Sequence, residues 1–306
     1  MTEQFCEVGG GITLCYETFG DRSDPPALLI MGLATQMVAW QEDFCNELAG
    51  RGLYVIRFDN RDSGRSTHLQ GRGPTIPELL LRSKRAARYT LADMADDTAG
   101  LLTQLDLAPA HLIGASMGGM IAQTLAIKRP ELVRSLVSIM SNTGSLRNGQ
   151  PSLRIYRAFL HRAPADRDGF IAHAEKLFAT IGSRGLARDV DGIRRIAEET
   201  FDRDPSTDGS ERQLAAIQAS PDRTRALRRL DTPTLVIHGT ADRLVSPSGG
   251  RATARAIPGA RLLSIEGMGH DLPRVIWPQL IDAIAEHASA ADAQASSTRD
   301  AQTVPR

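Results

Sequence analysis

Cysteine is scarce in this chain, and its spacing argues against a disulfide framework. The 306 residues include three cysteines, Cys6, Cys15 and Cys45, and no two of them form a C-x-x-C pair. An odd number of widely spaced cysteines is typical of a protein that folds in a reducing compartment. The sequence also has no group of histidines and cysteines at metal-ligand spacing, so we expect neither a metal ion nor another cofactor.

The chain also lacks an excess of either charge and any long apolar run. Its 36 basic and 36 acidic side chains balance, so the net charge does not favour binding to nucleic acid or to an anionic membrane. No apolar run approaches the roughly 20 residues of a membrane-spanning helix. The first residues, MTEQFCEVGGG, have neither the basic start nor the apolar centre of a signal peptide. We therefore expect a cytoplasmic protein with no membrane or nucleic-acid partner, while its oligomeric state has no signal in the sequence.

The stretch AHLIGASMGGMIAQTLAIKRP, residues 110–130, carries the strongest functional signal. An apolar run typical of a buried strand leads into the turn GASMG and then into apolar residues at helical spacing. Strand, G-x-S-x-G turn and helix form the nucleophile-elbow pattern. Its glycines leave room for a tight turn that holds Ser116 in a strained geometry, and the Met117 N–H would point from the helix N-terminus toward an oxyanion. The alternative is an ordinary glycine-rich turn in which Ser116 caps the helix.

Apolar runs and helical patterns alternate along most of the chain, and this alternation predicts an α/β fold with a mostly parallel sheet. The expected strands are residues 12–19, 27–31, 53–58, 111–113, 132–140, 234–238 and 261–265. Between residues 145 and 229 the strand-like runs give way to helical patterns. We therefore expect a core of residues 1–144 and 230–288, a helical cap of residues 145–229, and a disordered tail of residues 289–306.

Two side chains suited to work with Ser116 follow the carboxyl ends of later strands, where open parallel sheets form their sites. These are Asp242, after the strand 234–238, and His270, after the strand 261–265. Serine is a poor nucleophile at neutral pH, so it needs a base to take its proton and a carboxylate to orient that base. The chain order Ser116, Asp242, His270 is the order expected behind an elbow serine. We predict His270 as the base and Asp242 as the orienting acid.

Other titratable residues are less well placed for these roles. His238 lies inside an apolar strand and is expected to be a buried structural residue. Asp231 precedes its strand and so lies at the wrong end of the sheet, and Asp271 is too close in sequence to His270 to reach its far ring nitrogen.

The second oxyanion donor should come from the loop after the strand 27–31. We choose the backbone N–H of Leu33, because Gly32 allows a close approach of the backbone. With the N–H of Met117, this amide would complete an oxyanion hole.

Four motifs resemble the α/β-hydrolase superfamily, and the resemblance covers about residues 5 to 288. They are DNRDSGRS at 59–66, GASMGG at 114–119, HGTAD at 238–242 and GMGH at 267–270. Within the superfamily the chain is similar to bacterial esterases of the aclacinomycin-methylesterase kind, and somewhat to cofactor-free haloperoxidases. The resemblance implies an eight-stranded sheet, a helical cap inserted after the sixth strand, and the triad Ser116–Asp242–His270. One position departs from many relatives, which carry histidine-glycine where this chain has Met31-Gly32.

The expected activity is the hydrolysis of a small-molecule carboxylic ester through an acyl-enzyme at Ser116. A serine at the elbow argues against haloalkane dehalogenases and soluble epoxide hydrolases, which resemble this fold but use aspartate there. The same triad serves cofactor-free haloperoxidases, perhydrolases, thioesterases and C–C bond hydrolases, so these activities stay open as alternatives. A non-catalytic ligand receptor on the same fold is the alternative from a different functional class.

Overall fold

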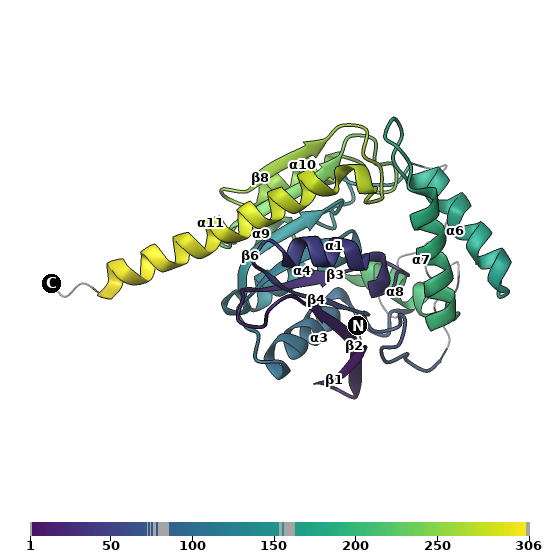
Figure 1. The fold of residues 1–306 in the computed structure, drawn as a ribbon, viewed down its shortest axis with the longest axis horizontal. Helices are drawn as coiled ribbons and strands as arrows, with labels where there is room; N and C mark the ends of the chain where they lie inside the picture. The colour runs from purple at the N-terminus through teal and green to yellow at the C-terminus, as the bar shows by residue number, and fades with distance from the viewer. Residues whose placement is uncertain are drawn as a thin grey trace.

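The computed structural model describes residues 2–303 except 72, 74, 76, 77, 79–85, 153, 154 and 156–162, and for 298–303 it describes the backbone only. One eight-stranded sheet in the order β1-β2-β4-β3-β5-β6-β7-β8 forms its centre (Figure 1). The strands are β1 (Gln4–Gly9), β2 (Ile12–Phe19), β3 (Pro26–Ile30), β4 (Tyr54–Phe58), β5 (Ala110–Ala115), β6 (Val133–Ile139), β7 (Thr234–Gly239) and β8 (Arg261–Ile265). β2 pairs antiparallel with β1 and β4, and the other neighbours are parallel. The predicted mostly parallel, eight-stranded sheet is therefore confirmed.

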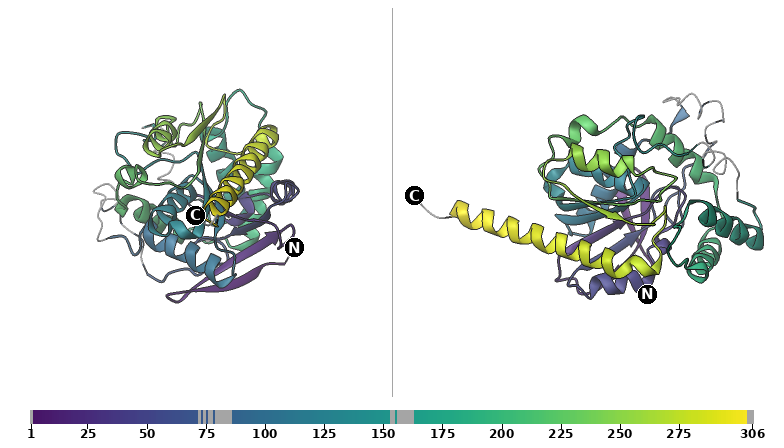
Figure 2. Two further views of the ribbon diagram at one scale, coloured as in Figure 1. Left: turned by 90° about the vertical axis from the view of Figure 1, so that its left-hand side faces the viewer. Right: turned by 90° about the horizontal axis from the view of Figure 1, so that it is seen from above.

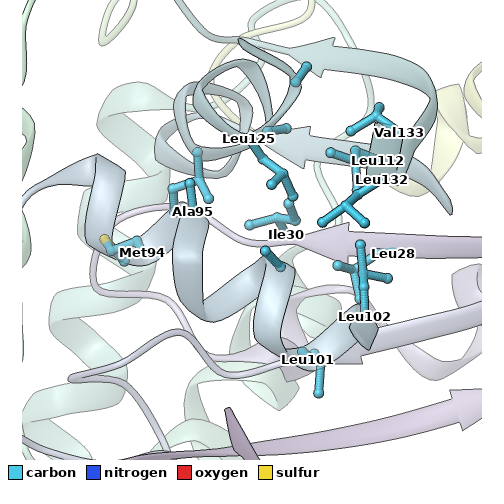
Figure 3. Close-up of a cluster of buried hydrophobic side chains, with 14 of the residues drawn as sticks. Leu28, Ile30, Met94, Ala95, Leu101, Leu102, Leu112, Leu125, Leu132 and Val133 are labelled. Atoms are coloured by element: carbon cyan, nitrogen blue, oxygen red, sulfur yellow. The ribbon is translucent and has the colours of Figure 1, made fainter. Parts of the chain in front are cut away.

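Side chains of the central strands alternate between two apolar layers, one on each face of the sheet. Leu28, Ile30 and Leu112 belong to the layer that includes α3 (Leu91–Gln104) and α4 (Met117–Lys128), part of which Figure 3 shows. Leu29 and Ile113 belong to the layer that includes α1 (Glu42–Ala49) and α11 (Trp277–Thr303). Because both faces are covered, these strands read in the sequence as unbroken apolar runs.

The chain between β6 and β7 forms helices and no strand in its described residues. These helices are α6 (Arg167–Ile181), α7 (Val190–Arg203), α8 (Asp208–Ala219) and α9 (Thr224–Leu227), and α10 (Ser248–Ala256) follows β7. α6 and α7 lie at one end of the molecule, and the free end of α11 lies at the other (Figures 1 and 2). Part of the helical pattern that the sequence shows after residue 145, at residues 153–160, falls almost wholly outside the described residues. We call residues 145–229 the inserted segment; that it forms a separate cap domain stays a prediction.

The last helix is longer than the sequence predicts. α11 continues to Thr303 and projects beyond the body of the molecule, whereas a disordered tail was expected from residue 289 (Figures 1 and 2). The first residues of this stretch make specific contacts, because Ala291 is buried and Asp292 accepts a hydrogen bond of 2.9 Å from Arg134 on β6. The expectation of disorder is therefore wrong for these residues, and the helix is tied to the sheet beyond its apolar part.

Two buried histidines, His111 on β5 and His287 on α11, should make the stability of the fold depend on pH. Burial lowers the pKa of His287 to about 4, and burial also lowers the pKa of His111, in each case from 6.5. Below about pH 6.5 these histidines become protonated in the unfolded chain but stay neutral in the folded chain. The free energy of unfolding therefore falls as the pH drops from 6.5 toward 4. For His287 the loss amounts to at most about 3 kcal/mol.

Urea unfolding at about pH 7.5 and about pH 5 measures this effect. A His287→Gln variant has no imidazole to titrate, so it should lose less stability between the two pH values than the wild type loses. An equal loss in both proteins would show that His287 does not contribute.

Candidate active site

Ser116 occupies the tight turn between β5 and α4. Its backbone has φ 55° and ψ −117°, a strained combination for a residue other than glycine. A Cβ atom at Gly114 would overlap the backbone of Gly118, and a Cβ atom at Gly118 would overlap the carbonyl group of Ile30. Ser141 Oγ donates to the carbonyl oxygen of Ser116 at 2.8 Å and so fixes the turn. The Ser116 side chain makes no capping hydrogen bond to α4, which removes the alternative that it is only a helix cap.

His270 lies between Ser116 and Asp242. Its Nε2 atom is 2.9 Å from Ser116 Oγ, and its Nδ1 atom is 2.8 Å from Asp242 Oδ2. His270 and Asp242 are 8% and 4% exposed, so both are largely shielded from water. The three side chains follow the carboxyl ends of β5, β7 and β8, and the structure brings them into one hydrogen-bonded row. Such a row can move a proton from the hydroxyl to the imidazole.

The carboxylate of Asp242 is held by partners on both of its oxygens. Oδ1 accepts hydrogen bonds of 2.9 Å from the N–H groups of Leu244 and Val245, and Oδ2 lies 3.4 Å from His238 Nε2 as well as near His270. Burial alone would raise the pKa of Asp242, but the charge of His270 and the hydrogen bonds from His238 and His270 outweigh burial and lower the pKa to about 2. The carboxylate is therefore ionised throughout the neutral pH range.

His238 is a buried residue, and it is also a neighbour of the candidate acid. It is 2% exposed, and its Nε2 donates a hydrogen bond of 2.8 Å to the carbonyl oxygen of Val245. The same nitrogen faces Asp242, four residues further along the chain. The sequence indicates the burial of His238, but the contact with Asp242 depends on how the chain turns after β7.

The loop that carries His270 is bonded to the end of α6. Ser183 Oγ accepts a hydrogen bond of 2.9 Å from the Gly269 N–H and donates one of 2.6 Å to Asp271 Oδ1, while the His270 N–H donates to the Ile181 carbonyl at 2.9 Å. The carboxylate of Asp271 therefore bonds to Ser183, and the residue next to His270 does not replace Asp242. No motif marks Ser183 in the sequence, because its role depends on how the inserted segment meets β8.

The loop after β3 runs directly beside Ser116. A Cβ atom at Gly32 would lie 3.1 Å from Ser116 Cβ, so only a residue without a side chain fits comfortably there. Asn60, in the DNRDSGRS motif, donates a hydrogen bond of 3.0 Å from Nδ2 to the carbonyl oxygen of Met31. The sequence gives no reason to connect Asn60 with this loop, because the two are joined only through the pairing of β3 with β4.

The two amides predicted as oxyanion donors flank Ser116. Leu33 follows Gly32 in the loop beside Ser116, and Met117 is the first residue of α4, where the N–H groups have no partner within the helix. No hydrogen bond from either N–H is found within the part of the chain that the structure describes. Both amides therefore keep the donor capacity that the predicted role needs.

Three further features of the structure bear on the expectations from the composition: the state of the cysteines, the character of the helices and the grouping of metal-ligating side chains. All three cysteines are buried and unpaired, and burial raises the pKa of Cys15 and of Cys45 to about 12. Among the helices of the described residues, none has the length and apolar character needed to cross a membrane. Nor do three or more His, Cys, Asp or Glu side chains gather as a metal site would require within the same described part of the chain.

Comparison with known proteins places this geometry in a family. The chain matches the model of the alpha/beta hydrolase fold over residues 25–273. It is 28% identical to rhodomycin D methylesterase DauP of Streptomyces sp. strain C5, over 92% of this chain and 96% of that protein. It is 30% identical to BpoC of Mycobacterium tuberculosis, which is named as a non-heme bromoperoxidase, over 85% of this chain and 91% of that protein.

A solved structure shares the architecture over nearly the whole chain. The enol-lactonase of Burkholderia xenovorans LB400 covers 94% of this chain and 99% of its own, with a TM-score of 0.70 and 23% identity. At that identity the likeness concerns the fold alone. The family match over residues 25–273, the sheet order and the strained turn at Ser116 agree with one another, and the chain belongs to the α/β hydrolase family.

Proposed function

We propose that the protein is a serine hydrolase that cleaves a carboxylic ester through an acyl-enzyme intermediate. The observation that carries the proposal is the pair of hydrogen bonds, 2.9 and 2.8 Å long, that joins Ser116 to His270 and His270 to Asp242. The nearest alternative among structural roles, a helix cap, leaves the conformation of Ser116 and its contact with His270 unexplained. A non-catalytic receptor does not require a histidine base hydrogen-bonded to a serine, so this contact favours an enzyme.

The first half of the proposed reaction forms the acyl-enzyme. Ser116 Oγ attacks the ester carbonyl carbon while His270 Nε2 takes the hydroxyl proton, and Asp242 stabilises the resulting imidazolium. The carbonyl oxygen becomes an oxyanion and accepts hydrogen bonds from the N–H groups of Leu33 and Met117. The intermediate then collapses, His270 returns the proton to the leaving oxygen, and the alcohol departs.

The second half repeats this chemistry with water. His270 takes a proton from a water molecule, whose oxygen attacks the acyl carbon bound to Ser116. The second tetrahedral intermediate uses the same two backbone donors. When it collapses, the proton goes back to Ser116 Oγ and the carboxylic acid is released.

The relatives support a small-molecule ester as the substrate. DauP is named for a methyl ester of rhodomycin D, and its similarity extends over 92% of this chain. The acyl and alcohol parts of the substrate of this chain are not fixed by an identity of 28%. A panel of esters that varies acyl length and alcohol size is the direct way to find them.

Cofactor-free peroxidation is a second candidate, favoured by the 30% identity with BpoC. In that reaction acetic acid acylates Ser116 with loss of water, and hydrogen peroxide then attacks the acyl carbon in place of water, which gives peracetic acid and frees the serine. The peracid then oxidises bromide, and the halogenation of monochlorodimedone reports it. Faster halogenation than ester cleavage would favour this activity over hydrolysis.

A serine-directed fluorophosphonate tests the proposed function. The purified protein should hydrolyse p-nitrophenyl esters, lose that activity on treatment, and gain one phosphonyl group on the peptide that contains Ser116, as read by mass spectrometry. His270→Ala should slow the labelling, because the hydroxyl then loses its base. A protein that hydrolyses no ester of the panel and reacts with the probe at no faster rate than its unfolded chain would contradict the proposal.

A further inference from the structure

Gln213, on α8 of the inserted segment, connects that segment to the loop beside Ser116. Its side chain is 0% exposed, and both ends of its amide are hydrogen-bonded to backbone groups. Oε1 accepts from the N–H of Ala34 at 2.8 Å, and Nε2 donates to the carbonyl oxygen of Arg61 at 2.8 Å. A buried amide with partners at both ends has one preferred orientation, so Gln213 is a fixed point for the residues that it contacts.

The Ala34 N–H belongs to the peptide group that follows the predicted oxyanion donor. The carbonyl oxygen of this same peptide group, that of Leu33, accepts a hydrogen bond of 3.0 Å from Thr35 Oγ1. The peptide group is therefore held from both of its polar atoms. Ala34 itself has φ 56°, a left-handed conformation that a residue other than glycine rarely adopts without support.

The peptide group before the donor is also held. The carbonyl oxygen of Met31 accepts the hydrogen bond of 3.0 Å from Asn60. The amide that lies between these two fixed groups joins Gly32 to Leu33, and its N–H is the predicted oxyanion donor. With both neighbouring peptide groups restrained, the direction of the Leu33 N–H is set by Asn60 on one side and by Gln213 with Thr35 on the other.

Contacts other than those of Gln213 also hold α8 against the core. A Cβ atom at Gly209 would overlap the carbonyl group of Asp62, so the start of the helix packs directly on the DNRDSGRS loop. Arg212 forms a buried ion pair of 2.7 Å with Asp62, which also accepts a hydrogen bond of 2.8 Å from Tyr89. Residues 209, 212, 213 and 216 share one buried face of α8 at helical spacing. A change at Gln213 therefore leaves other contacts that hold the helix in place.

We propose that Gln213 is a positioning residue for ester hydrolysis, which aims the Leu33 N–H at the oxyanion by holding the peptide group between Leu33 and Ala34. This inference rests on the proposed function, because it concerns the donor of that reaction. It also gives the inserted segment a part in the chemistry, since a helix outside the sheet orients one of the two donors of the oxyanion hole.

Gln213→Met tests the proposal, because methionine keeps the length of the side chain and removes both hydrogen bonds. Complete loss of one oxyanion donor lowers turnover by about 10²–10³-fold, and a donor that is only misdirected should lower kcat by about 10-fold to 100-fold. KM should change by less than about threefold, because the donor acts mainly on the transition state. Inhibition by a trifluoromethyl ketone, which forms a tetrahedral adduct with the serine, should weaken by the same factor as kcat/KM.

Two further variants separate positioning from a general loss of packing. Gln213→Glu keeps an acceptor for the Ala34 N–H, so its kcat should recover to within about threefold of the wild type. Gln36→Met is the matched control, because Gln36 is also buried and donates to the carbonyl oxygens of Thr200 and Asp204 in the inserted segment. It should lower the stability but leave the kcat of the folded protein within about twofold of the wild type.

The outcomes distinguish this inference from the proposed function. If the wild type hydrolyses no ester, the proposed function fails and the role of Gln213 fails with it. If the wild type is active and folded Gln213→Met retains its kcat, or if Gln36→Met loses as much kcat as Gln213→Met, the ester chemistry stands and the positioning role is wrong. A slow Gln213→Met, a restored Gln213→Glu and an unchanged Gln36→Met together support it.

Discussion

Replacing Ser116 by alanine should lower kcat for a p-nitrophenyl ester by about 10⁴- to 10⁶-fold, because the attacking atom is removed and only the binding and oxyanion contributions remain. The fold should tolerate the change. The strained turn depends on the glycines at 114 and 118 and on the bond from Ser141 to the carbonyl oxygen of residue 116, none of which needs the hydroxyl. Initial rates of p-nitrophenol release, with circular dichroism to check folding, measure the effect.

The structure offers a closely matched control for this experiment. Ser135 Oγ lies 2.9 Å from His111 Nδ1, and the other ring nitrogen of His111 lies 3.4 Å from Asp292 Oδ2. Ser135 and His111 are both 0% exposed, so this second row of serine, histidine and aspartate has no access to substrate. Ser135→Ala should therefore leave kcat within about twofold of the wild type, although it removes a buried hydrogen bond. Full activity in Ser116→Ala would reject the proposed mechanism.

The two rows differ in how strongly the sequence marks them, and this difference explains why the sequence favours Ser116 as the candidate nucleophile. Ser135 and Asp292 belong to no motif, whereas Ser116 lies in a G-x-S-x-G pattern whose glycines indicate a tight, strained turn. Asp242 and His270 could be found because each follows a short apolar strand, and the carboxyl ends of parallel strands meet at one edge of the sheet. The central strands of the sheet were predictable for a different reason: strands that are buried on both faces give unbroken apolar runs in the sequence.

The residues that sequence analysis missed act across long separations in the chain. Gln213 and Ser183 reach the loops beside Ser116 and His270 from the inserted segment, and nothing local to either residue indicates its partner. At the end of α11 the composition predicts the wrong local structure. Its small polar residues predict disorder, but the ion pair of Asp292 with Arg134 depends on tertiary packing that composition does not contain.

Asp242→Asn is expected to lower kcat by about 10⁴-fold with little change in structure. The N–H groups of Leu244 and Val245 both donate to Oδ1, so the asparagine carbonyl oxygen takes that position and its NH₂ group faces His270 Nδ1. An NH₂ group there donates to Nδ1 and leaves the proton on Nε2, the nitrogen that must accept the proton of Ser116. The imidazole then has the wrong tautomer for a base, and no carboxylate stabilises the imidazolium.

Two aspartates provide the controls for this variant. Asp231→Asn changes an exposed residue before β7, and Asp271→Asn changes a carboxylate that bonds to Ser183. Asp231→Asn should have wild-type kcat, and Asp271→Asn should lose far less activity than Asp242→Asn. Because the pKa of Asp242 is about 2, the acid limb of the wild-type pH profile should not come from this carboxylate, and the limb should fall well above pH 2. A larger loss in Asp271→Asn than in Asp242→Asn would assign the orienting role to Asp271 and overturn the triad proposed here.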